Sequence, residues 1–206
     1  MSLKKFTNKQ NEPVTLTDGR MVWLARSCAV VGHILLFSIR HQNWYVLLGK
    51  RGQGTPDCQG YWGLPCGYLD WDETLTQGMM REVWEECGLY LPNLKDNPDF
   101  GWSESACIHS GLDAKDHPWW ISDNPGSGKQ NISMHFAVAF SWRGEQFPQL
   151  SAENAEPDEV EDIAWVEIEE ACSMDLAFNH AQHIRQLRQL KSELFESVQM
   201  QQETQP

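Results

Sequence analysis

The sequence is short of positive charge, of long apolar runs and of paired cysteines. Its 206 residues contain 16 lysines and arginines against 29 aspartates and glutamates, a formal net charge of −13 at pH 7. This balance disfavours a nonspecific nucleic-acid binder, which needs a basic face to displace counterions, and it disfavours docking on anionic lipid. We therefore predict neither a nucleic-acid partner nor a membrane partner.

Long hydrophobic segments are also missing. The longest run, CAVVGHILLF (residues 28–37), is far too short to cross a bilayer. The first residues, MSLKKFTNKQNEPV, are polar and contain no apolar core of a signal peptide. The six cysteines show neither a CxxC pair nor the spacing of a zinc site, and a small disulfide scaffold is not expected at this chain length. We expect reduced thiols and a cytoplasmic protein.

The pattern of apolar residues predicts an α+β fold. Strands are expected at residues 20–25, 28–39, 44–51, 131–142 and 162–168, with short strands in YWGLPCGYL (61–69) and near SACIHSG (105–111). Helices are expected at 74–87, where Gly88 is placed to end the helix, and from about residue 179 to residue 200. Strands and helices do not alternate regularly, which disfavours a doubly wound sheet and favours a mixed α+β sandwich.

The predicted helix at 74–87 concentrates negative charge on one face. Glu82, Glu85 and Glu86 fall within one narrow sector, where glutamates three or four residues apart repel by roughly 0.2–0.5 kcal/mol per pair. Gly78 lies one turn earlier on the same side, and a small residue there suggests that another group crowds the helix. Clustered carboxylates suit Mg²⁺ or Mn²⁺, whose charge would remove the repulsion. Taken alone, the three glutamates fit a solvated acidic helix face equally well.

The wider pattern decides between these two interpretations. Gly67, Glu73 and the run REVWEECGL (81–89) reproduce the spacing G-x5-E-x7-R-E-U-x-E-E-x-G-U. Residues 67–89 thus resemble the box of the Nudix hydrolase family at every fixed position. The preceding YWGLPCGYLD is similar to the family's W-x-x-P-G-G entry, with Cys66 in place of the first glycine. The resemblance implies a Nudix-type α/β/α sandwich with a mixed sheet over residues 20–175, preceded by an N-terminal extension (1–19) and followed by a C-terminal helix and polar tail (176–206).

The resemblance also implies a reaction, the Mg²⁺- or Mn²⁺-dependent hydrolysis of a diphosphate bond in a nucleoside diphosphate derivative. Arg81 and Glu73 would pair to orient the loop and the helix. The implied metal ligands are Glu82, Glu85, Glu86 and the backbone carbonyl of Cys66.

Two other functions and the assembly stay open at this point. The main alternative is a non-catalytic Nudix module that senses a nucleotide, for which a degraded box or an appended basic DNA-binding domain would be expected. The isomerase chemistry of isopentenyl diphosphate enzymes is disfavoured by the intact box. The resemblance also allows a homodimer.

A metal cluster around a diphosphate should need a further carboxylate from a second element, and in several Nudix enzymes a later loop supplies it. Residues 153–175 contain ten carboxylates and no lysine or arginine, and most of these acids fit a solvated surface. EPDEVEDIAWV (156–166) resembles the E-x-D-E segment that precedes a tryptophan-containing strand in nucleotide-triphosphate members of the family. This favours Glu159 as catalytic residue and metal ligand, with Glu156 as runner-up. The remaining candidates are Glu153, Asp158 and Glu161.

Three residues outside the box are candidates for substrate contact. Lys50 and Arg51 could reach a phosphate, and the alternative is simple solvation at a strand end. Trp119, in DHPWW, could stack on a base. The seven histidines show no zinc spacing, so surface or packing roles are expected for them. No subgroup marker is convincing, which leaves nucleoside triphosphates, ADP-ribose, NADH, nucleotide sugars and dinucleoside polyphosphates as substrates to test.

Overall fold

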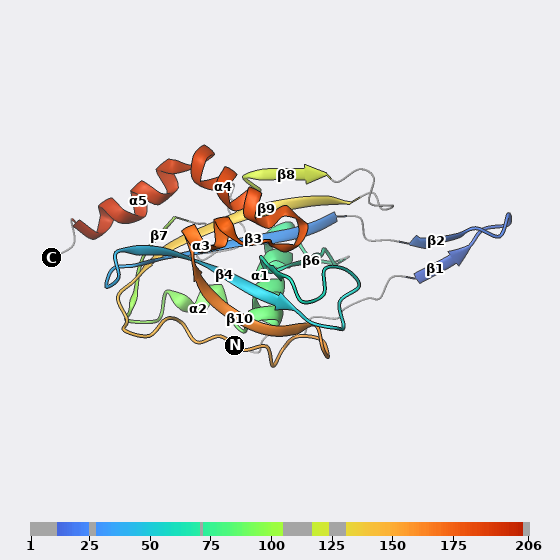
Figure 1. Cartoon of the computed structure of the whole chain (residues 1–206), viewed down its shortest axis with the longest axis horizontal. Helices are drawn as coiled ribbons and strands as arrows, with labels where there is room; N and C mark the ends of the chain where they lie inside the picture. The colour runs from blue at the N-terminus through green and yellow to red at the C-terminus, as the bar shows by residue number, and fades with distance from the viewer. Residues whose placement is uncertain (1–11, 25–27, 71, 105–116, 124–130, 204–206) are drawn as a thin grey trace.

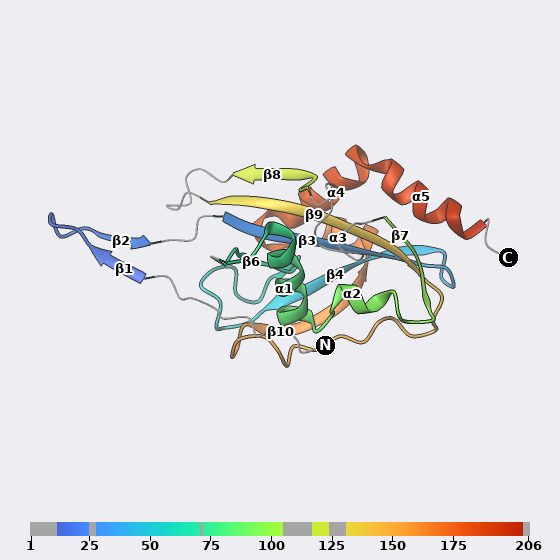
Figure 2. The same cartoon turned by 180° about the vertical axis from the view of Figure 1, so that it is seen from behind.

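The computed structural model describes residues 12–24, 28–70, 72–104, 117–123 and 131–203. In these parts of the chain an eight-stranded sheet lies between two layers of helices (Figures 1 and 2). One face is covered by α1 (Leu75–Cys87) and α2 (Leu91–Leu94), and the other by α3 (Ile168–Ser173), α4 (His180–Leu190) and α5 (Ser192–Glu203). The predicted α/β/α sandwich with a C-terminal helix is confirmed.

The sheet is built around two long strands, β3 (Cys28–Ser38) and β9 (Ile132–Trp142), which pair in parallel along their whole length. β4 (Asn43–Arg51) pairs antiparallel with β3, and β10 (Val160–Glu167) pairs antiparallel with β4 at the edge. Because parallel and antiparallel pairs occur together, the sheet is mixed, as predicted.

Four shorter strands complete the sheet. These are β5 (Trp62–Gly63) on β4, β6 (Cys66–Tyr68) on β3, and β7 (Phe100–Glu104) and β8 (Trp120–Asp123) on β9. The single short strand predicted in YWGLPCGYL is therefore two strands, separated by Leu64 and Pro65; proline has no N–H to donate to a ladder. The helix α2 has no counterpart among the predicted elements. The strand predicted near residues 105–111 lies outside the described residues.

The alternation along β9 sorts its side chains onto two cores. One face packs on α1 and carries the large apolar residues Met134, Phe136, Val138, Phe140 and Trp142. The other face carries Ala137 and Ala139, which pack with Ile184 of α4 and Val198 of α5. The small residues predicted on this face therefore admit a layer of helices. Ile132, predicted on the large-residue face, is 38% exposed at the end of the strand.

α1 begins and ends where the sequence predicts. The hydroxyl of Thr74 accepts the N–H of Gln77 at 3.2 Å, and the side chain of Gln77 accepts the N–H of Thr74 at 2.9 Å, which forms a capping box. Gly88 follows the helix with φ 68°, and its N–H donates to the carbonyl of Trp84. Both ends of the helix are thus fixed, and so is the direction in which its glutamates point.

The C-terminal helical segment is two helices rather than one. α4 ends at Leu190 and α5 begins at Ser192, because Lys191 takes φ −131° and ψ 43°, outside the helical region. The prediction of one continuous helix was wrong, since residues 190–192 contain no glycine or proline to mark the break. The predicted apolar stripe nevertheless packs on the second core; its members are Ile184, Leu187, Leu194 and Val198. No helix in the described part of the chain has both the length and the apolar character of a membrane span.

The strand predicted at residues 20–25 is β2 (Met21–Leu24). It pairs with β1 (Glu12–Thr15), a strand inside the segment that was predicted only as an extension. The β1–β2 hairpin is separate from the main sheet. It projects from one end of the sheet, and α5 lies toward the opposite end (Figure 1). The domain boundaries at residues 19 and 175 stay predictions.

Candidate active site

Arg81 lies at the centre of a buried ionic network on α1. Its side chain is 4% exposed, and its guanidinium donates to Glu73 at 2.8 Å, to Glu82 at 2.7 Å and to Glu85 at 2.8 Å. It also donates to the backbone carbonyl of Tyr68 at 2.9 Å. Although burial opposes the charge, the hydrogen bonds with Glu73 and the charge of Glu82 raise the pKa of Arg81. Arg81 therefore ties the segment before the helix to the helix itself.

Two glycines allow this close packing of carboxylates. A Cβ atom at Gly67 would lie 2.2 Å from a carboxylate oxygen of Glu82. A Cβ atom at Gly78 would lie 2.9 Å from a carboxylate oxygen of Glu73 and 2.9 Å from Cδ1 of Leu69. The crowding expected at Gly78 is thus present, and it comes from the segment that Arg81 holds against the helix.

Glu86 makes a different contact from the other glutamates of α1. Its carboxylate accepts the N–H of Cys66 at 3.1 Å, across 20 residues of sequence. Glu86 and Cys66 line a hollow that also receives Glu159, from the loop before β10. We call this site the hollow. Its lining includes Lys50, Arg51, Cys66, Glu86, Glu159, Phe178 and His180. α1 and the loop before β10 therefore each contribute one carboxylate to the hollow.

Burial and mutual repulsion raise the pKa of these carboxyl groups. Burial raises the pKa of Glu82 to about 8, with Arg81 opposing the shift and Glu85 reinforcing it. The pKa of Glu86 lies well above its usual range because the group is buried and faces the charges of Glu82 and Glu159. Burial also raises the pKa values of Glu85 and Glu159. With no cation to compensate them, burial and the neighbouring carboxylates therefore disfavour the charged forms of Glu82 and Glu86.

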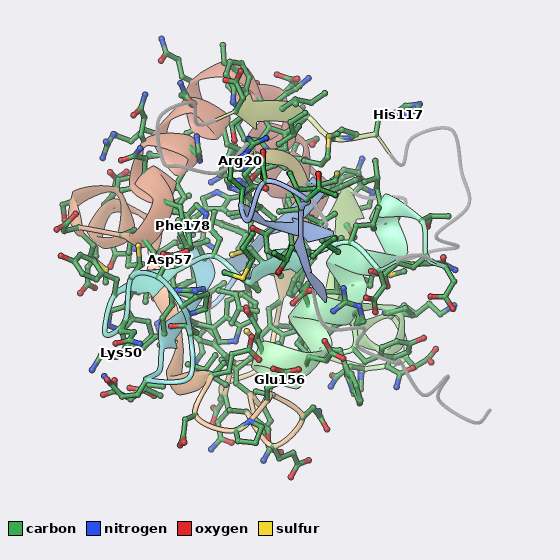
Figure 3. All side chains as sticks on the ribbon, turned by 90° about the vertical axis from the view of Figure 1, so that its right-hand side faces the viewer. Arg20, Lys50, Asp57, His117, Glu156 and Phe178 are labelled. Carbon is green, nitrogen blue, oxygen red and sulfur yellow. The ribbon has the colours of Figure 1, made fainter. Side chains whose placement is uncertain are left out.

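Lys50 and Arg51 line the hollow from the end of β4, and Figure 3 shows this side of the molecule with Lys50 labelled. The ammonium group of Lys50 lies 2.6 Å from the carboxylate of Glu161, so its charge already has a partner. Arg51 donates from Nε to the backbone carbonyl of Asp57 at 3.0 Å. The charge of Arg51 also acts on Glu86 and Glu159, where it opposes the rise of their pKa values, so Arg51 supplies positive charge to the hollow.

Trp119 lies apart from the hollow. Its ring packs on the second core, 5.3 Å from the ring of His33 and 6.0 Å from that of Trp120, measured between centroids. This placement gives no support to the predicted contact with a substrate base. The packing role expected for histidines is observed at His33 and His135, which are buried and hydrogen-bonded to each other at 3.0 Å.

Among the lining residues that sequence reasoning missed are Phe178 and His180. Nδ1 of His180 accepts the N–H of Leu64 at 2.9 Å, a contact between positions 116 residues apart. Such a contact leaves no local pattern in the sequence. The one available signal was the predicted start of a helix near residue 179, which marks a turn at this position.

In the described residues no three carboxylate, histidine or cysteine side chains are gathered closely enough to hold a metal ion. The contacts explain this, because Glu82 and Glu85 are turned toward Arg81 and Glu86 toward the N–H of Cys66. The donor set nevertheless fits Mg²⁺ or Mn²⁺, since both prefer carboxylate oxygens. Burial, and to a lesser extent the neighbouring carboxylates, raise the pKa values of Glu82 and Glu86, and a bound cation would offset both effects.

Comparison with known families identifies the source of this arrangement. A family model described as NUDIX domain matches residues 27–190, which is most of the chain. The chain belongs to the Nudix family. The resemblance inferred from residues 67–89 is confirmed.

Three similar proteins show the range of similarity. The human m7GpppN-mRNA hydrolase NUDT17 is 30% identical over 122 residues, which are 59% of this chain and 33% of the relative, so the chain spans about a third of that protein's length. The NUDIX domain of Shewanella oneidensis NrtR complexed with ADP ribose is 20% identical, with a TM-score of 0.51 over 81% of this chain and 88% of that one. A bifunctional NMN adenylyltransferase/ADP ribose pyrophosphatase from Francisella tularensis, complexed with AMP and a Mn ion, is 19% identical, with a TM-score of 0.51 over 79% and 41% of the two chains. The two solved structures share the fold with this chain.

Proposed function

We propose that this Nudix protein is a divalent-cation-dependent pyrophosphohydrolase that cleaves a diphosphate bond in a nucleoside diphosphate derivative. One arrangement supports the proposal: Glu86 of α1 and Glu159 from before β10 share a hollow with the guanidinium of Arg51. A diphosphate requires positive charge around it, and an attacking water requires a base. Proteins similar to this chain are named as an mRNA cap hydrolase and an ADP ribose pyrophosphatase, so substrates of this class occur among its relatives.

The residues that would hold the cation are Glu82, Glu85, Glu86, Glu159 and the backbone carbonyl of Cys66. A bound Mg²⁺ or Mn²⁺ supplies charge neutralisation at the phosphates and a lowered pKa for the attacking water. Glu82 and Glu85 are held by Arg81 at 2.7 Å and 2.8 Å, so ligation would require their carboxylates to turn toward the hollow.

The remaining residues would position the substrate and move a proton. Glu159 has a raised pKa, which suits a base that takes the proton of the water near neutral pH. Arg51 would bind a phosphate oxygen, because charge-assisted hydrogen bonds from guanidinium to phosphate are strong. Lys50 would contribute only after its ion pair with Glu161 opens. Arg81 and Glu73 would keep the segment before α1 in place.

A substrate panel tests this function. Nucleoside triphosphates, ADP-ribose, NADH, nucleotide sugars and dinucleoside polyphosphates would be incubated with the protein in Mg²⁺, in Mn²⁺ and in excess EDTA. We expect turnover of at least one of them, only with a cation, and full turnover in EDTA would contradict the role given to the carboxylates. Binding of a nucleotide without turnover of any substrate would instead favour the nucleotide-sensing module. The homodimer and the cytoplasmic location stay predictions.

A further inference from the structure

Phe178 combines an unusual backbone conformation with an exposed ring. It has φ 53° and ψ 29°, and Asn179 follows with φ 60° and ψ 24°, so two consecutive non-glycine residues occupy the left-handed region. Asparagine tolerates this region, whereas a bulky side chain rarely occupies it, because its Cβ crowds the backbone. Residues held in such conformations cluster at ligand-binding positions, where the surrounding fold fixes them.

The fold around Phe178 fixes the turn from both sides. Leu176 and Ala177 before it are 5% and 2% exposed, and His180 after it is 2% exposed. The bond from the N–H of Leu64 to His180 connects the turn to the segment that leads to Cys66. Phe178 itself is 40% exposed. Its ring therefore contributes little to the core, although its neighbours hold it in a costly conformation.

The ring lies at the candidate active site. Phe178 and Arg51 line the same hollow as Glu86 and Glu159. The guanidinium carbon of Arg51 lies 4.9 Å from the centroid of the Phe178 ring, a cation–π contact. Figure 3 labels Phe178 on the same side of the molecule as Lys50. An aromatic surface is thus placed beside the cation that would receive a phosphate, and a nucleotide presents a matching pair of groups.

We propose that Phe178 contacts the substrate by stacking on its nucleobase while Arg51 binds a phosphate. The inference rests on the proposed function in one respect, that the substrate is a nucleoside diphosphate derivative. Every base has a π-face, so stacking raises the affinity for base-containing ligands without selecting one base. Phe178 would therefore separate nucleotides from diphosphates that have no base, and other contacts would select among nucleotides.

The test compares two ligands that differ in the nucleoside. Isothermal titration calorimetry in Mg²⁺ would measure the binding of ADP and of inorganic pyrophosphate to the wild type, Phe178→Ala and Phe178→Trp. We expect Phe178→Ala to weaken ADP binding by about tenfold and to change pyrophosphate binding by less than about twofold. Phe178→Trp should keep the affinity for ADP. Ile121→Ala is the matched control, because Ile121 is an apolar residue 57% exposed on β8, outside the hollow.

A glycine variant separates this role from a structural one. Phe178→Gly and Phe178→Ala both remove the ring, but only glycine tolerates the left-handed backbone, so Phe178→Gly should melt at a higher temperature than Phe178→Ala while its affinity for ADP falls equally. Equal losses for ADP and pyrophosphate would show that the ring only holds Arg51, and they would overturn the proposal. The proposal would also be overturned if Phe178→Ala and Phe178→Gly bound ADP as tightly as the wild type does, or if the wild type did not bind ADP. Because binding needs no turnover, a nucleobase contact without hydrolysis would count against the proposed function alone.

Discussion

Replacing Arg81 by methionine should destabilise the protein by about 3–5 kcal/mol, the cost of leaving buried charges without their partner. The Arg81 side chain is 4% exposed and donates to the carboxylates of Glu73, Glu82 and Glu85. Methionine has a similar length but no donor, so all three carboxylates and the carbonyl of Tyr68 lose a hydrogen bond. An exposed ion pair, in contrast, contributes about 0–1 kcal/mol.

The carboxyl groups can lessen this loss by taking up protons, since burial already raises the pKa of Glu82 and Glu85. The destabilisation by Arg81→Met should therefore be larger at pH 8 than at pH 5. Urea unfolding followed by circular dichroism at both pH values measures it. For a chain of this length we expect the melting temperature to fall by roughly 6–20 °C.

Arg188→Met is the matched control. Arg188 lies 2.6 Å from Glu169, and the two side chains are 37% and 63% exposed, so this variant should stay within about 1 kcal/mol of the wild type. If Arg81→Met were as stable as Arg188→Met at both pH values, the buried network would not hold the segment before α1, and the reasoning would be refuted.

Three other changes follow from the same carboxylates. Without divalent cations, the free energy of unfolding should fall as the pH rises from about 4.5 to about 8, because burial raises the pKa of folded Glu82 to about 8 from an ordinary value of 4.5. Urea unfolding at pH 5 and pH 8.5 in EDTA measures this difference, and Mg²⁺ should reduce it. Glu159→Gln should lower kcat by about 100-fold, because it removes the proposed base. Glu161→Gln only frees Lys50 and should keep kcat within about twofold of the wild type. Equal kcat values for the two variants would contradict the assignment of Glu159 as the base. Gly67→Ala should raise the Mg²⁺ activation constant about tenfold, because the new Cβ would lie 2.2 Å from the carboxylate of Glu82; an unchanged constant would count against that geometry.

The sequence predicts the structure well where the deciding contacts are local. Thr74, Gln77 and Gly88 fix both ends of α1 through neighbours a few residues away, so the helix and its glutamates could be placed in advance. The alternation along β9 likewise follows from the period of a strand, and it correctly separates the large apolar face from the small one.

The remaining features depend on contacts that no local pattern records. His33 meets His135 across 102 residues because β3 and β9 pair in parallel, and Leu64 meets His180 across 116. The left-handed turn at Phe178 is held by buried neighbours rather than by glycine. Propensity alone likewise gives no reason for the break at Lys191.

The kcat of Glu86→Gln tests the central claim most directly, namely that buried carboxylates catalyse a cation-dependent hydrolysis. The amide keeps the shape of the side chain and an oxygen that can accept the N–H of Cys66, and it replaces a group whose pKa is raised by burial. We predict that kcat falls by about 100-fold or more, roughly 2.7 kcal/mol of transition-state stabilisation, while the melting temperature of the cation-free protein does not fall. A well-folded Glu86→Gln protein with the kcat of the wild type would contradict the account.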